Sequence, residues 1–198
     1  MSYDNFDASE NMTEGIENLE TLDDVAHVEA GSRGFELETE GQIADSIEHL
    51  NQMPEIQPEQ WEGLSIDERL NTVQNVENVM AEVQNRPSVP VELADLSPNE
   101  FGGYDGQSIK INQDHIAGGQ DVKENVDTII HEGRHAYQDY VISHPELVSD
   151  QEMVQSWADN FENYLDLQTY GAELYTDQPV ERDAWTYAEA VCNGVYEK

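Results

Sequence analysis

Basic residues are scarce in this chain. Its 198 residues include 8 lysines and arginines against 43 aspartates and glutamates, which gives a formal net charge of −35. The only lysines are Lys110, Lys123 and Lys198. Because phosphates and anionic lipid surfaces attract clusters of basic side chains, this composition argues against nucleic acids and membrane surfaces as partners.

Two explanations of the negative charge remain open. One is a high-salt habitat, in which a strongly acidic surface keeps a protein hydrated and soluble. The other is a secreted or delivered protein, or a protein with a basic partner. Neither explanation determines what chemistry the chain performs.

Cysteine and long apolar runs are also nearly absent. Cys192 is the only cysteine, so no disulfide can form within the chain, and its expected role is that of a small buried residue late in a helix. Residues 1–7 have neither a basic start nor an apolar run, and no stretch approaches the length of a membrane span. We therefore expect a soluble protein, made in the cytoplasm without a signal peptide, that needs a dedicated route for any export.

Apolar residues are sparse over residues 1–58, where Arg33 is the only basic residue. Weak helical stripes remain, one of them formed by Ile43, Ile47 and Leu50, and residues 53–58 contain two prolines that are typical of a linker. We expect an acidic, partly disordered N-terminal segment over residues 1–58 and a compact domain over residues 59–198. The segment is either a solubilising tail or a leader, inhibitory or adaptor segment.

The compact part contains signals for several helices and one small sheet. A capping box at Ser65–Glu68 starts a helix that ends near Arg86, and Asp105-Gly106 marks the turn of a hairpin over residues 101–112. Further expected elements are an edge strand at 89–93, helices at 150–164 and 170–175, and a last helix from Asp177, as N-cap, to about Gly194. The fold class is therefore α+β with helix dominant and a small antiparallel sheet.

The motif His131-Glu132-Gly133-Arg134-His135 lies within a helical pattern of apolar residues. Residues four apart share one face of a helix, so His131 and His135 can point at the same ion. Two neutral imidazoles suit Zn²⁺, and Glu132 is placed to accept a proton from a water molecule that the metal activates. We interpret the motif as the centre of a catalytic zinc site.

Two histidines leave such a site incomplete, because a catalytic zinc usually has three protein ligands. No third histidine follows at short spacing, so we expect a carboxylate from a later helix. Glu181, in the first turn of the last helix, is the first choice, and Asp183 is its rival or a partner to a ligand histidine. Glu173 and Glu162 rank lower, and neither His115, expected at the surface, nor His144, at the end of the motif helix, is assigned to the metal.

Three segments carry a family resemblance. The motif His131–Gln138, the segment 160–164 and the segment 175–184 together resemble a group of bacterial zincin-like metallopeptidase domains, which often form the C-terminal toxin or effector part of larger secreted proteins. The resemblance covers about residues 60–195. It implies a gluzincin-type site with His131, His135 and Glu181 on Zn²⁺, a protein or peptide substrate, and a delivery or immunity protein as a further partner.

The function expected from these residues is zinc-dependent endopeptidase activity with Glu132 as general base. Tyr170, Tyr175 and Tyr187 are candidates for the donor that stabilises the oxyanion, and the sequence does not choose among them. The alternative is a protein-binding module on a zincin scaffold with a structural or non-catalytic metal site. An intact Glu132 argues against that alternative, because a structural site needs no base.

Overall fold

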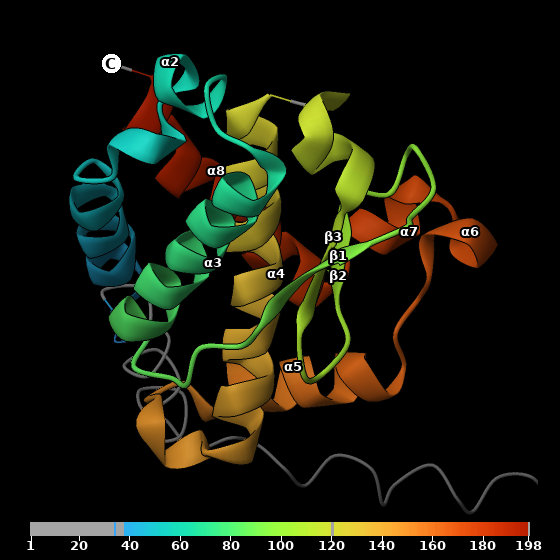
Figure 1. The fold of residues 1–198 in the computed structure, drawn as a ribbon. Helices are drawn as coiled ribbons and strands as arrows, with labels where there is room; N and C mark the ends of the chain where they lie inside the picture. The colour runs from blue at the N-terminus through green and yellow to red at the C-terminus, as the bar shows by residue number, and fades with distance from the viewer. Residues whose placement is uncertain (1–33, 35–37, 120, 198) are drawn as a thin grey trace, which may run out of the picture.

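A computed structural model describes residues 34, 38–119 and 121–197 of the chain (Figure 1). A helix over residues 38–50 comes first. The elements that follow are η1 (Pro54–Ile56), α2 (Pro58–Trp61), α3 (Ile66–Val83), β1 (Val91–Ala94), β2 (Gly102–Tyr104), β3 (Ile109–Asn112), η2 (His115–Gly119), α4 (Val122–Ser143), η3 (Pro145–Leu147), α5 (Gln151–Glu162), α6 (Leu167–Tyr170), α7 (Ala172–Thr176) and α8 (Pro179–Tyr196). The expected α+β class with helix dominant is confirmed at this level.

Helix α4 carries the motif and lies at the centre of the molecule (Figure 1). Its N-cap is Asp121, whose side chain accepts from the Glu124 backbone, and it ends before the expected stop at His144-Pro145. It contacts α3, α5, α8 and the sheet, and nearly every side chain from Val126 to Gln138 is buried. A helix surrounded on all sides places polar motif residues in the interior, where they must find partners.

Two apolar clusters hold these elements together. The larger joins α3, α4, α8, the sheet and the segment before α3, and the smaller surrounds Trp157 of α5 and the later part of α4. Cys192 is buried in the larger cluster, as expected. None of the helices described here combines the length and apolar character that crossing a membrane requires.

The sheet is mixed, so the prediction of an antiparallel sheet is wrong in part. The hairpin of β2 and β3 is antiparallel as expected, and its turn uses Gly106 at a φ of 88°. The strand order is β1-β3-β2, however, and β1 runs parallel to β3. The physical reason is burial: Ile109 and Ile111 of β3 are both inside the core, so β3 takes the middle and β1 is left at the edge.

Part of the expected N-terminal segment packs on the core. Ile43, Ile47 and Leu50 face α8 and its neighbours, and Leu50 is fully buried. The linker interpretation of residues 53–58 is wrong, because η1 and α2 begin at the two prolines and Ile56 is fully buried. The division of the chain at residue 58 stays a prediction, since residues 1–33 and 35–37 lie outside the described part.

Most local signals were right, but the helix expected at 170–175 is two short helices, α6 and α7, that meet at Gly171 with a φ of 81°. The capping box of Ser65 and Glu68 is present. The last helix, however, has Gln178 as N-cap, because Asp177 closes the preceding short helix in an αR conformation. His115 is buried, not at the surface: its ring packs against Phe101 and its Nε2 lies 3.2 Å from the Pro98 carbonyl oxygen.

Gly133, inside the motif, allows a buried ion pair to approach α4. Glu77 and Arg86 form a bidentate salt bridge with distances of 2.7 and 2.9 Å, and an Arg86 nitrogen donates to the Gly133 carbonyl oxygen at 3.0 Å. A Cβ at position 133 would lie 2.9 Å from Glu77 Oε2 and 3.1 Å from Arg86 Nη2. The glycine is therefore required by packing, although it weakens the helix locally.

We expect Gly133→Ala to destabilise the protein by about 1–2 kcal/mol, because crowding of the ion pair outweighs the gain of about 1 kcal/mol in helix propensity. Urea unfolding of the two proteins measures the difference. The matched control is Gly41→Ala in the helix over residues 38–50, where a Cβ meets nothing within 4 Å. A Gly133→Ala protein as stable as the Gly41→Ala protein would contradict this account of the glycine.

Candidate metal centre

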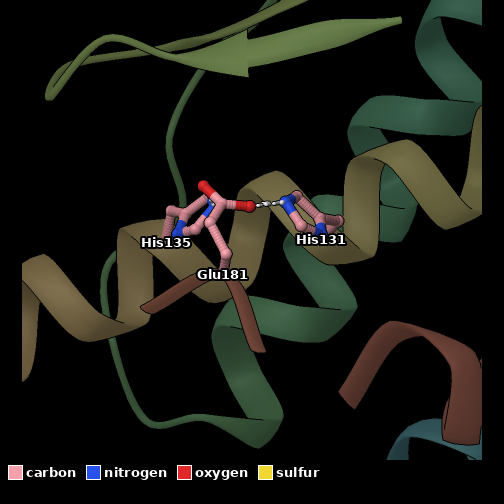
Figure 2. A group of neighbouring side chains, drawn as sticks. All are labelled: His131, His135 and Glu181. Atoms are coloured by element: carbon pink, nitrogen blue, oxygen red, sulfur yellow. Dashed lines mark hydrogen bonds and ion pairs between the residues drawn. The ribbon is translucent and has the colours of Figure 1, made fainter. Parts of the chain in front are cut away.

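The structure brings His131, His135 and Glu181 together. The two histidines lie one turn apart on α4, and Glu181 comes from the first turn of α8, with its carboxylate directed at both imidazole rings (Figure 2). All three side chains are buried. The carboxylate expected from the last helix therefore lies beside the two histidines of the motif.

The distances within this cluster suit a single ion. The two Nε2 atoms are 3.1 Å apart, and the Glu181 oxygens lie 3.3 Å from His131 Nε2 and 3.4 Å from His135 Nε2. Tetrahedral bonds of about 2.0–2.1 Å would place two ligand atoms about 3.3–3.4 Å apart. Glu181 Oε2 is buried with no hydrogen-bond partner among the described residues, which is costly unless a cation neutralises it. The cluster can hold a metal ion.

His135 and Glu181 shift each other's pKa in opposite directions. Burial alone lowers the pKa of His135, but its contact with Glu181 and the charges of Glu132 and Glu181 outweigh burial and raise the pKa to about 9. Burial alone raises the pKa of Glu181, but the two histidines outweigh it and hold that pKa well below its ordinary value. Because an imidazole binds a metal ion only through an unprotonated nitrogen, metal binding here competes with protonation of His135.

Glu132 is held by the backbone of β2. Its Oε2 accepts from the Tyr104 N–H at 2.8 Å, and the side chain is almost completely buried. The strand comes this close because of Gly102, where a Cβ would lie 2.8 Å from Thr128 Cγ2 of α4. Glu132 thus has a fixed carboxylate at the edge of the cluster, as a positioned proton acceptor requires.

The rival carboxylates lie elsewhere. Asp183 accepts two bonds from Arg134, at 2.8 and 3.0 Å, and one from Gln138 at 2.7 Å. It is therefore a partner of residues behind the site and does not belong to the cluster. Glu162 and Glu173 are exposed on α5 and α7 and are not members of the cluster either.

The three tyrosines considered as oxyanion donors lie in different parts of the structure. Tyr187 is buried, its hydroxyl lies 3.0 Å from that of Ser46, and its ring packs on Arg134. Tyr170 is about half exposed, and no contact joins it to the cluster. Tyr175 packs edge-on against Tyr164, with ring centroids 6.1 Å apart. Tyr175 is the only one of the three that lies next to a residue of the site.

Tyr164 is a site residue that the sequence did not reveal. Its hydroxyl donates to Glu181 Oε1, and burial together with that carboxylate raises the pKa of Tyr164 well above its ordinary value. The hydroxyl therefore remains a hydrogen-bond donor at any physiological pH. Tyr164 ends the segment 160–164 that carries the resemblance, but no local pattern assigns it to the site, because it meets Glu181 only in the folded chain.

Trp185 and Gln138 were also missed, although helical spacing offered a signal for both. Trp185 follows Glu181 by four residues on α8, so it shares that face, and its ring lies 4.5 Å from the ring of His131. Gln138 follows His135 by three residues on α4, and its Oε1 lies 2.8 Å from His135 Nδ1. Trp185 is about half exposed, so its ring offers a solvent-accessible apolar surface beside His131.

No protein family model, curated protein or solved structure matches this chain. The resemblance to zincin-like metallopeptidase domains therefore stays a prediction that is carried by the motifs alone.

Proposed function

We propose that the chain is a zinc-dependent endopeptidase, with His131, His135 and Glu181 as the zinc ligands and Glu132 as the general base. The observation that carries the proposal is the convergence of three buried ligand side chains beside the fixed carboxylate of Glu132. A set of two histidines and a glutamate is typical of catalytic zinc. The toxin or effector role rests on the resemblance of the motifs and belongs to this proposal.

A zinc ion in this cluster would lower the pKa of a water molecule to about 7 and polarise the peptide carbonyl. With zinc bound, Glu132 would take the proton of the attacking water as the water oxygen bonds to the carbonyl carbon. The same carboxyl group would then deliver that proton to the leaving nitrogen as the C–N bond breaks. The Tyr104 N–H holds the Glu132 carboxylate in place through both steps.

Tyr164 is our choice for the donor that stabilises the developing oxyanion. Its hydroxyl already lies at the cluster, on Glu181, and about two fifths of the residue is exposed to solvent and so to a substrate. Because a hydroxyl has one hydrogen, Tyr164 would stabilise an oxyanion by turning that hydrogen from Glu181 to the new acceptor. Trp185, about half exposed beside His131, offers an apolar surface for a substrate side chain.

The competing function is a binding module with a structural metal site. Structural zinc sites usually have four protein ligands, whereas catalytic sites have three and leave one position for water. The cluster of described residues has three members. That number favours catalysis, and so does the fixed carboxylate of Glu132, which a structural site would not need.

The experiment that tests the proposal is digestion of a peptide library by the full chain supplied with Zn²⁺. New termini identified by mass spectrometry give both activity and cleavage preference. We expect cleavage by the wild type that stops when a chelator is added and returns with zinc. A zinc-loaded wild type that cuts no peptide or denatured protein would favour the binding module.

A further inference from the structure

Gln138 is a fully buried amide with every polar atom engaged. Its Nε2 lies 2.9 Å from the Val180 carbonyl oxygen and 2.7 Å from Asp183 Oδ2, and its Oε1 lies 2.8 Å from His135 Nδ1. It therefore connects the start of α8 to one of the two histidines of the cluster.

The partners of Gln138 decide which way its amide faces. A backbone carbonyl oxygen only accepts, and the Asp183 carboxylate, which already accepts from Arg134, accepts as well. A flipped amide would set an oxygen against two acceptors inside the protein, at the full cost of buried unpaired groups. The nitrogen of Gln138 must therefore face α8, and its oxygen must face His135.

The fixed oxygen in turn determines the tautomer of His135. Because Gln138 Oε1 only accepts, His135 Nδ1 must carry a hydrogen and donate it. In the neutral ring, the lone pair is then on Nε2, which is the atom that faces His131 and Glu181. A neutral imidazole with a bare Nε2 is the form that binds a metal ion.

The support behind Gln138 is itself rigid. Arg134 is fully buried between the rings of Tyr137 and Tyr187, with its Cζ 4.4 and 4.5 Å from their centroids. It binds both oxygens of Asp183 and donates to Gln42 Oε1 at 2.9 Å. Asp183 cannot turn away from Gln138 without breaking this bidentate pair.

We propose that Gln138 is a positioning residue that holds His135 in its metal-binding tautomer and so sets the zinc affinity of the site. The inference rests on the metal site of the proposed function. His131 has no corresponding support, because its Nδ1 is buried without a hydrogen-bond partner among the described residues. Of the two histidines, His135 is therefore the one whose ring a hydrogen-bond partner fixes.

The test is the zinc affinity of the full chain, measured by competition with a chromophoric chelator, in wild type and Gln138→Met. We expect Zn²⁺ to bind about 10–100-fold more weakly to the variant, the usual effect of removing a partner of a ligand histidine. Gln74→Met is the matched control, because Gln74 also bonds through both amide atoms, but to Asn78 and to the backbone around β1 and not to the cluster. It should leave zinc affinity unchanged.

A second substitution separates positioning from loss of structure. Gln138→Glu, in its protonated form, keeps an oxygen for His135 Nδ1 and donates a hydrogen to Asp183 Oδ2, whereas Gln138→Met does neither. We expect Gln138→Glu to keep more zinc affinity than Gln138→Met. An affinity as low as that of Gln138→Met would contradict the acceptor role.

A spectroscopic measurement gives a second readout. In ¹⁵N spectra of the zinc-loaded wild type, His135 should show a ring N–H at Nδ1 that exchanges slowly with water, and Gln138→Met should lose that protection. Unchanged zinc affinity and unchanged protection in Gln138→Met would overturn the positioning role while leaving the zinc site intact. A wild type that binds no Zn²⁺ would overturn the proposed function and this inference with it.

Discussion

Glu132→Gln should reduce peptide hydrolysis by about 10²–10⁴-fold, the usual contribution of a general base, and leave zinc bound. The amide has nearly the same shape and still offers an oxygen to the Tyr104 N–H, so the position of β2 on α4 should not change. It cannot accept a proton from water, however, and this is the step that the mechanism assigns to Glu132. The measurement is the hydrolysis rate on a peptide found in the library digest, together with zinc content.

The control for this variant is Glu124→Gln, which changes an exposed glutamate in the first turn of the same helix. It should retain both hydrolysis and zinc. A Glu132→Gln protein that binds zinc and hydrolyses peptides at the wild-type rate would contradict the assigned base. Loss of zinc in Glu132→Gln would show instead that Glu132 belongs to the ligands.

Arg86→Met should lower the free energy of unfolding by about 3–5 kcal/mol, because it leaves the carboxylate of Glu77 buried without its counter-charge. Both side chains of this pair are almost completely inaccessible to solvent. Arg86 also donates to the Gly133 carbonyl oxygen inside the motif, so its loss removes a contact between the turn after α3 and helix α4. Urea unfolding of wild type and variant measures the effect.

The double variant Glu77→Gln with Arg86→Met tests the cause of that loss. Removing both charges should cost less than removing Arg86 alone, because no unpaired charge then remains in the interior. Equal destabilisation in the single and double variants would show that packing around Arg86, and not its charge, holds this region together.

Residue spacing and capping and turn residues predicted the features that form within one helix or one hairpin. The spacing of His131 and His135 places both rings on one side of any helix, and α4 forms as expected. Glu181 was favoured by its place in the first turn of the last helix and by the resemblance of its surroundings. The hairpin and the capping box followed from turn and capping residues in the same way.

Long-range contacts do not follow from such local features. Asp183 was weighed as a ligand, and its pairing with Arg134 depends on how α8 crosses α4. The parallel pairing of β1 depends on which strand takes the middle of the sheet. The acidic composition before residue 58 favoured a disordered segment, whereas Leu50 and Ile56 are fully buried. In each case the deciding partner lies far away in the sequence.

The zinc content of the purified full chain tests the central claim most directly, with wild type measured beside Glu181→Ala and Glu189→Ala. Glu189 is an exposed glutamate on the same helix and serves as the matched control. We predict about one zinc per chain in wild type and Glu189→Ala, and little or none in Glu181→Ala, because a catalytic zinc needs its third protein ligand. A wild type that holds no zinc after the metal is supplied, or a Glu181→Ala protein that binds zinc as tightly as wild type, would contradict the proposed site.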